Sequence, residues 1–206
     1  MQILKIIISL IISLIPHNFL KVKLLNFFLS YKIDTKSKIG FFNIICINKV
    51  FLQNGEIGNF NYINIQEMNL LDTKISNFNR IYNFNIFETK NFSLVGSFNI
   101  IFGKNKQIGV LKMNKAQFTT SHIIEVNNEF FLDEDVVFGG INSIINSGKT
   151  LKKTKISKNV YFGSSIFLAA GSSICEKVLV GSGSTIHKDI IASGLYTSNT
   201  LKKSIL

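Results

Sequence analysis

Three histidines, His17, His122 and His187, are the side chains of this chain best suited to moving a proton near neutral pH. His122 lies near the middle of the sequence, and Glu125 follows it three residues later. A histidine can act as a general base toward a hydroxyl group, which is a poor nucleophile until its proton is removed. Two residues three apart on a strand point to opposite faces, so a direct His122–Glu125 contact requires a corner between them.

The other two histidines fit structural positions. His17 stands beside Pro16, the only proline of the chain, in a turn between two apolar segments. His187 falls one position after an apolar repeat residue, where a corner is expected. His122 is therefore the candidate base, and the alternative is a corner or surface histidine without a chemical role.

The elements that must position these side chains come from a repeat of six residues. In the first block an apolar residue occupies every sixth position except Asn69, at Ile33, Ile39, Ile45, Phe51, Ile57, Ile63, Ile75, Ile81 and Phe87. The same spacing returns at Ile156, Phe162, Leu168, Ile174, Val180 and Ile186. A period of six matches neither a helix nor an ordinary strand, and it predicts an all-β parallel β-helix built from hexapeptides.

Two other positions of the repeat carry small or amide side chains. Glycine follows the core residue at Gly40, Gly58, Gly163 and Gly181, where we expect a corner with positive φ. In the first half, asparagine stands two residues before the next core residue and follows a phenylalanine, in the pairs Phe42–Asn43, Phe60–Asn61, Phe78–Asn79, Phe84–Asn85 and Phe98–Asn99. Three hexapeptides make one coil, so we expect these amides to bond along a buried column. The phenylalanines should stack outside it, as an interface or as a seat for the N-terminal segment.

The repeat is interrupted between residues 88 and 117 and again between residues 144 and 155. Such interruptions are insertions that project from a coil. Insertions on one face of a solenoid commonly build its binding site, so we expect the chemistry in the middle third of the chain.

Residues 1–32 form an apolar segment ahead of the predicted solenoid of residues 33–206. Both apolar stretches in it are shorter than the roughly 20 residues of a spanning helix, and the first lacks the cleavage site of a signal peptide. We expect two short helices that either lie on a membrane surface or cap the solenoid. Four lysines would help them on a membrane: Lys5, Lys21, Lys23 and Lys32.

Charge and cysteine content narrow the partners and the compartment. The net charge of +11 fits anionic partners such as CoA phosphates, lipid headgroups or nucleic acid, and it also fits the lysine-rich composition of an AT-rich genome. No nucleic-acid-binding motif is present, so we expect no nucleic acid partner. Cys46 and Cys175 are far apart and lack metal-ligand spacing. They indicate thiols in a reducing compartment, here the cytoplasm or the inner face of its membrane, and no metal site.

Two segments resemble the hexapeptide-repeat acyltransferases. Residues 155–190, KISKNVYFGSSIFLAAGSSICEKVLVGSGSTIHKDI, are similar to the end of that family's β-helix. Residues 118–125, FTTSHIIE, resemble the Thr-Ser-x-His-x-x-Asp/Glu stretch of acyltransferases that modify cell-surface sugars. The front of the chain is similar to the same group, so the resemblance covers nearly the whole chain.

The resemblance implies a left-handed β-helix, a homotrimer, and acetyl-CoA or a related acyl-CoA bound between neighbouring subunits. It implies an O-acyltransferase acting on a sugar hydroxyl of a polysaccharide or lipopolysaccharide, with His122 as the base and Glu125 as the carboxylate that orients it. In the C-terminal coils, room for the pantetheine arm and a cation for the CoA phosphates would come from Gly163, Ala169, Ala170, Gly181 and Lys188.

The chain departs from the family at one position. Many members carry a Thr-His pair after the coil that contains Phe138, and here Ser147 and Gly148 stand in its place. This keeps a second class of function open, a diverged β-helix that binds or scaffolds without catalysis. A nucleotide-sugar N-acyltransferase is a third alternative, which the membrane-like front end fits less well.

Overall fold

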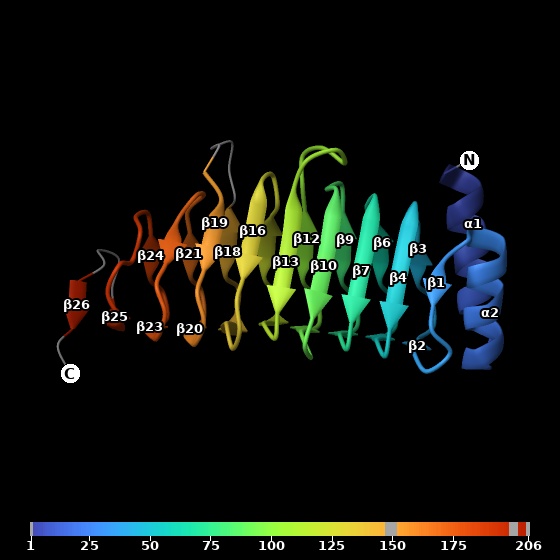
Figure 1. Ribbon diagram of the computed structural model, residues 1–206, viewed down its shortest axis with the longest axis horizontal. Coiled ribbons are helices and arrows are strands. Elements are labelled where there is room, and N and C mark those ends of the chain that lie inside the picture. Colours follow the sequence, from blue (N-terminus) through green and yellow to red (C-terminus); the bar gives the residue numbers. More distant parts are fainter. Residues whose placement is uncertain (1, 147–151, 198–201, 205–206) are drawn as a thin grey trace.

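The computed structural model describes residues 2–146, 152–197 and 202–204. Two helices, α1 (Gln2–Ser13) and α2 (Asn18–Leu29), come first, and short strands follow. The strands wind into a solenoid that runs from the helices at one end to the C-terminus at the other (Figure 1). The predicted all-β, left-handed parallel β-helix with short N-terminal helices is confirmed.

Each coil gives one strand to each of three sheets. The first sheet contains β1 (Lys32–Ile33), β4 (Lys49–Gln53), β7 (Glu67–Leu71), β10 (Ile86–Lys90), β13 (Val110–Asn114), β16 (Glu129–Leu132), β19 (Thr154–Ile156) and β22 (Ser173–Ile174). The second contains β2 (Lys38–Ile39), β5 (Glu56–Ile57), β8 (Lys74–Ile75), β11 (Leu94–Val95), β14 (Gln117–Thr120), β17 (Val137–Ile141), β20 (Val160–Phe162), β23 (Val178–Val180), β25 (Gly194–Thr197) and β26 (Lys202–Ser204). The third contains β3 (Ile44–Ile45), β6 (Tyr62–Asn64), β9 (Arg80–Tyr82), β12 (Ile100–Phe102), β15 (Ile123–Glu125), β18 (Ile144–Asn146), β21 (Phe167–Leu168) and β24 (Thr185–Ile186).

The core is a set of apolar columns inside the coils. One column of buried residues runs along the second sheet through Ile39, Ile57, Ile75, Val95, Phe118, Phe138, Phe162 and Val180. Phe138 and Phe162 stack with ring centroids 4.2 Å apart. Strand pairing places these residues in register from coil to coil, so each one packs on its counterpart in the next coil.

The first sheet departs from the strict period of six. Phe51, which the repeat places inside, is 42% exposed, and its neighbours Val50 and Leu52 are buried. Asn69 pairs in register with Phe51 and faces outward as well. Strands of this sheet reach five residues, as in β4 and β7, so each turns two side chains inward around an outward one. The prediction of Phe51 as a core residue is therefore wrong, and the break at Asn69 marks an outer position.

The left-handed backbone of the corners lies two residues later than expected. Gly40 and Gly58 do not have positive φ; the positive values, 56° to 60°, fall on the phenylalanines of the predicted outer column, Phe42, Phe60, Phe78 and Phe98. Gly40 is needed for close approach instead, because a Cβ there would lie 2.3 Å from the carbonyl oxygen of Gly58 in the next coil. A bulky residue in this region of φ is uncommon, so neighbouring bonds must hold the corner.

Those bonds come from a ladder of buried asparagines one residue after the phenylalanines. The Oδ1 atom of Asn43 accepts the backbone N–H of Asn61 at 2.8 Å, and that of Asn61 accepts the N–H of Asn79 at 2.9 Å. Asn79 accepts the N–H of Asn99 in the same way, at 2.9 Å. The predicted amide column is present, and its main link is side chain to backbone. Each amide satisfies a buried donor of the next coil.

The outer phenylalanines form a stack on the surface. Successive rings of Phe42, Phe60, Phe78 and Phe98 lie 4.8 to 5.0 Å apart and nearly parallel. These four rings are 46 to 55% exposed, so the N-terminal segment does not cover the column and the column is not its seat. Phe84, predicted to face outward, is buried in a different corner.

The two helices close the N-terminal end of the solenoid. Lys21 is buried and its Nζ donates to the carbonyl oxygens of Ile39 and Gly40, at 2.8 and 2.9 Å. Asn18 binds the backbone N–H of Ile39 at 2.9 Å through its Oδ1. Ser9, Asn26 and Tyr31 bond to the backbone of the first coil in the same manner. These side chains occupy the backbone groups that a preceding coil would otherwise bind.

The helices and the coils share one hydrophobic core, so the division into residues 1–32 and 33–206 stays a prediction. In the part of the chain that the structure describes, no helix is long and apolar enough to cross a membrane.

Replacing Asn61 with leucine should lower the free energy of unfolding by about 1 to 3 kcal/mol, because the buried N–H of Asn79 loses its acceptor. Asn69→Leu, on the outer face, is the matched control and should change it by less than about 0.5 kcal/mol. Urea unfolding followed by circular dichroism measures both. Equal losses in the two variants would contradict a stabilising role of the ladder.

Candidate functional site

His122 lies inside the solenoid, at the corner between β14 and β15. Its side chain is 0% exposed. The backbone N–H of His122 donates to Oδ1 of Asn99 at 2.9 Å, and its Nδ1 accepts the N–H of Ser143 at 3.2 Å. The imidazole therefore takes the place of an amide in the asparagine ladder, one coil after Asn99.

The hydrogen bonds of the ring select one tautomer. Nε2 lies 3.0 Å from Oγ1 of Thr119, and this oxygen is also 2.9 and 2.6 Å from the carbonyl oxygens of Phe138 and Gly140. The single hydroxyl proton is used by a carbonyl, so Nε2 donates to Oγ1. Because Nδ1 accepts from a backbone N–H, the ring is neutral with its proton on Nε2.

The surroundings favour the neutral ring. The rings of Phe118 and Phe138 each lie with their centroids 6.4 Å from that of His122. Burial among these groups lowers the pKa of His122, and a bond to the backbone of Phe138 opposes this more weakly.

Glu125 does not contact the His122 ring. The chain from Ile123 to Glu125 is the strand β15, with the corner before it, so the carboxylate points to the outer side of the sheet, where it is 12% exposed, while the imidazole points into the solenoid. Oε1 of Glu125 accepts from Nδ2 of Asn127 at 2.7 Å and pairs with Nζ of Lys104 at 3.1 Å. The partner of the imidazole is Thr119, which is partly exposed. Sequence reasoning included Thr119 in the family-like segment and gave it no role.

The residues predicted for acyl-CoA lie at two different corners. Gly163 and Gly181 follow strands of the second sheet, at the corner that leads to the third. Ala169, Ala170 and Lys188 follow strands of the third sheet, at the corner that leads to the first. The two glycines and the two alanines are partly buried, and Lys188 is exposed. The outer face of β21 and β24 separates the two groups, so a ligand that touches both must cross this face.

Two insertions lengthen the corner between the third and first sheets. One comprises residues 103–109 between β12 and β13 and projects from its coil in Figure 1, and the other joins β18 to β19. Ser147 and Gly148, which replace the family's Thr-His pair, fall in the second and lie outside the described residues. The coil with residues 118–125 therefore has an insertion in the coil before it and in the coil after it at this corner.

Lys106 of the first insertion borders a hollow that sequence reasoning missed. Nζ of Lys106 donates to Oδ1 of Asn64 at 2.6 Å, so the loop folds back toward the N-terminal coils. Together with Lys5 and Gln66 it lines a hollow of about 290 Å³. The signal was a lysine-rich run, KNKQ, between Gly103 and the next strand.

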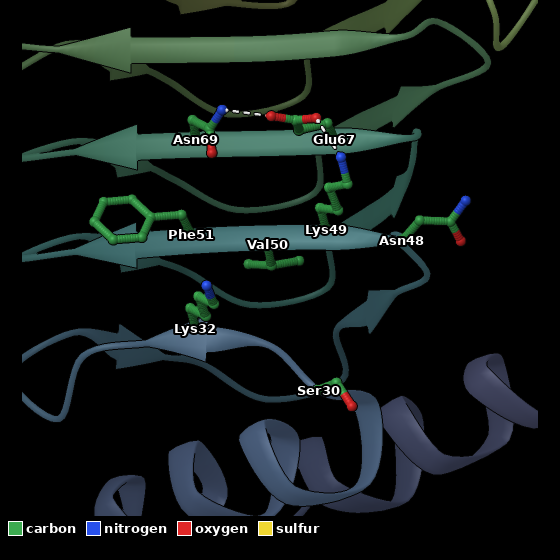
Figure 2. A pocket seen from close by; sticks show the side chains of 8 residues that line it. All are labelled: Ser30, Lys32, Asn48, Lys49, Val50, Phe51, Glu67 and Asn69. Carbon is green, nitrogen blue, oxygen red and sulfur yellow. Dashed lines mark hydrogen bonds and ion pairs between the residues drawn. The ribbon is translucent and has the colours of Figure 1, made fainter.

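Figure 2 shows another hollow, of about 310 Å³, on the first sheet near the helices. Glu67 is held there by Nζ of Lys49 at 3.7 Å and by Nδ2 of Asn69 at 2.9 Å. Its lining residues lie between 30 and 69, several coils before His122. None of the predicted site residues lines this hollow, and its only carboxylate is already paired.

The other two histidines, His187 and His17, lie away from the His122 site. His187 is exposed and its ring centroid lies 5.8 Å from that of Phe167. His17 directly precedes α2 and makes no capping bond with its side chain. Among the described residues, no group of three or more His, Cys, Asp or Glu side chains could hold a metal ion.

The parallel ladders and the period of the coils define a hexapeptide-repeat, left-handed β-helix. No family model matches the chain. Its sequence is similar to "Bifunctional protein GlmU" of Helicobacter hepaticus, with 39% identity over 108 residues, 50% of this chain and 23% of that protein. It is also similar to GlmU of Campylobacter concisus, with 45% identity over 51 residues, 25% of this chain and 12% of that protein.

GlmU of Thermodesulfovibrio yellowstonii gives 41% identity over 59 residues, 29% of this chain and 13% of that protein. The chain thus spans less than a quarter of the length of these curated relatives. Among solved structures, the polySia specific acetyltransferase NeuO matches with 14% identity and a TM-score of 0.30, over 79% of this chain and 75% of that one. The sequence matches and the solenoid bear out the resemblance to hexapeptide-repeat proteins.

The buried, neutral His122 should make stability depend on pH. In the unfolded chain its pKa is about 6.5 and in the native chain it is lower, so the unfolded state binds more protons below about pH 6.5. Stability should therefore fall as the pH drops from about 6.5 toward the native pKa, by up to about 1.4 kcal/mol per pH unit.

Urea unfolding at several pH values checks this against His122→Asn, which keeps a ladder amide as at Asn99 and removes the titration. His17 and His187 remain in both proteins and provide the baseline. Parallel pH curves for the two proteins would rule out a shifted pKa at His122.

Proposed function

We propose that the protein is an O-acyltransferase that moves an acyl group, acetyl in the simplest case, from CoA to a hydroxyl of a cell-surface polysaccharide or lipopolysaccharide sugar. The hydroxyl oxygen attacks the thioester carbonyl, the C–S bond breaks, and the hydroxyl proton leaves with CoA as its thiol. The proposal includes a homotrimer in the cytoplasm with peripheral contact to the inner face of a membrane.

The observation that carries this proposal is the position of the family-like segment. Residues 118–125 lie in the coil of β13, β14 and β15. The coils before and after it carry insertions at the corner between the third and first sheets, and insertions of this kind commonly build the binding site of a solenoid. The similarity to GlmU over half of the chain supports the hexapeptide-repeat class. We assign acyl-CoA binding to the C-terminal coils, at Gly163, Ala169, Ala170, Gly181 and Lys188.

Within this proposal His122 is the base and Thr119 connects it to the surface. Thr119 is a partly exposed residue and its hydroxyl oxygen lies 3.0 Å from Nε2, so we assign it as the route by which a proton reaches the buried ring. Base action at Nε2 requires the proton of the resting ring on Nδ1, and therefore loss of the bond from the N–H of Ser143. Glu125 acts on the neighbouring corner through Lys104.

In the structure Nδ1 of His122 accepts the N–H of Ser143, and base action would require this bond to break. This observation favours a second candidate function, a non-catalytic β-helix that binds or scaffolds. In this alternative His122 serves the ladder alone, and the missing histidine at Gly148 has no consequence. The two candidates differ in whether the protein binds acyl-CoA.

Isothermal titration of the full chain with acetyl-CoA, followed by a CoA-release assay with glycan acceptors, separates them. For the acyltransferase we expect saturable binding, and we expect His122→Asn to lower turnover by about 10²-fold or more while thermal stability near pH 8 stays unchanged. The asparagine keeps an acceptor for the N–H of Ser143, so loss of activity in a folded variant is attributable to the missing imidazole. Thr119→Val should lower turnover in parallel, since it removes the hydroxyl between ring and surface.

Unchanged turnover in His122→Asn would remove His122 from the mechanism and leave the acyltransferase with another base. Absence of acetyl-CoA binding by folded protein, together with absence of CoA release, would overturn the acyltransferase and leave the scaffold.

A further inference from the structure

The capping helices have two faces of opposite chemistry. Their polar side chains Ser9, Asn18, Lys21 and Asn26 bond to the backbone of the first coil. Their outer face carries large apolar side chains that are 46 to 79% exposed: Ile3, Leu4, Ile7, Ile11, Leu14, Phe19, Leu20, Phe27 and Phe28. Exposed apolar side chains gathered in this number mark a contact surface for a protein or a membrane.

The geometry makes this face one surface. Figure 1 shows α1 and α2 side by side across the end of the solenoid, and the two helices contact each other. In α1 the exposed residues Ile3, Ile7 and Ile11 follow the spacing of one helical stripe, and Leu14, directly after the helix, is exposed as well. Neither helix is long enough to span a bilayer. A short amphipathic helix of this kind lies in the plane of a membrane interface.

The positive charge of the N-terminal segment indicates which kind of partner its apolar face binds. Residues 1–33 contain four lysines and no aspartate or glutamate, and Asp34 is the first acidic residue of the chain. Lys23 is exposed on α2 with its Nζ 4.3 Å from the centroid of the Phe19 ring, and Lys32, Lys36 and Lys38 are exposed on the first coil. A second copy of the chain would bring like charges together at this end, whereas an anionic lipid surface pairs with them.

We infer that the outer face of α1 and α2 docks on an anionic lipid membrane, so that the capping helices seal the solenoid on one side and hold it upright on the bilayer on the other. The apolar side chains enter the boundary between headgroups and acyl chains, and Lys23 extends to the headgroup phosphates. The inference concerns the membrane partner named in the proposed function, but it rests on the cap alone and holds for an enzyme or a scaffold.

Co-sedimentation of the full chain with vesicles tests this inference. Wild-type protein should bind vesicles of equal parts phosphatidylglycerol and phosphatidylcholine more tightly than vesicles of phosphatidylcholine. The combined variant Ile3→Ser, Ile11→Ser and Phe27→Ser should reduce binding by about tenfold or more, because it removes apolar surface from the contact. Lys23→Gln should weaken binding several-fold to the anionic vesicles only.

A matched control removes the same side-chain types elsewhere on the surface. Phe92, Ile144 and Ile191 are 77%, 45% and 88% exposed and lie away from the cap, so their replacement by serine should leave binding within about twofold of wild type. Circular dichroism of each variant should match that of the wild type, which checks that the solenoid is kept.

The chain has no tryptophan, so the fluorescence of a single introduced tryptophan can report whether that position enters the membrane. The emission of Phe27→Trp should shift to the blue when vesicles are added, and that of Phe92→Trp should not. Three outcomes would overturn the inference: no vesicle binding by the wild type, equal loss in the control triple, or self-association through the cap without lipid binding, seen by analytical ultracentrifugation. None of these readouts uses acyl transfer, so failure here is distinguishable from failure of the proposed function.

Discussion

Every coil of this solenoid depends on the next one for its hydrogen bonds. A parallel strand of two residues has no partner within its own coil, so its N–H and C=O groups are satisfied only by the coils above and below. The corners obey the same constraint, because the side chain of Asn43 binds the backbone of Asn61 in the next coil, and this pattern continues along the column. Stability is therefore shared between neighbouring coils rather than held within one.

A stack of this kind must have a first coil, and its outer edge would be unpaired. In this chain the polar residues of the two helices bind that edge, and they include the buried Lys21, whose Nζ donates to the carbonyl oxygens of Ile39 and Gly40. Directing these groups inward leaves the other side of both helices apolar. The exposed face is thus a direct consequence of how the cap is built, and a lipid surface is an environment that suits it.

The hydrogen bonds of the asparagine ladder also determine which nitrogen of His122 is available for chemistry. The imidazole replaces an amide, accepts a backbone N–H as the amide does, and remains neutral because burial disfavours its charged form. A base needs a free lone pair, and here Nδ1 is used by Ser143 while Nε2 carries the proton. Catalysis by this ring requires the hydrogen bond from the N–H of Ser143 to Nδ1 to break, although this bond stabilises the fold. The structural and the catalytic role therefore compete for Nδ1.

The sequence by itself determined the architecture. A period of six with apolar residues at the core position cannot be buried by a helix or a flat sheet, so Ile39, Ile57 and Ile75 specify stacked coils without further information. The pairing of asparagine with the preceding phenylalanine likewise predicted an inner amide column and an outer aromatic one, since period and burial together fix the face of each residue.

Only the tertiary structure decided which residues meet across coils. It turned Phe51 outward because the strands of the first sheet are longer, and it placed positive φ on Phe42 rather than Gly40. It also put His122 inside and Glu125 outside, with Thr119 as the partner of the ring. The bond from Ser143 to His122 and the pair of Lys104 with Glu125 each join residues about one coil apart, and the length of each coil varies with its insertions. A local pattern specifies the face of a side chain, while its neighbour in space depends on the register between coils.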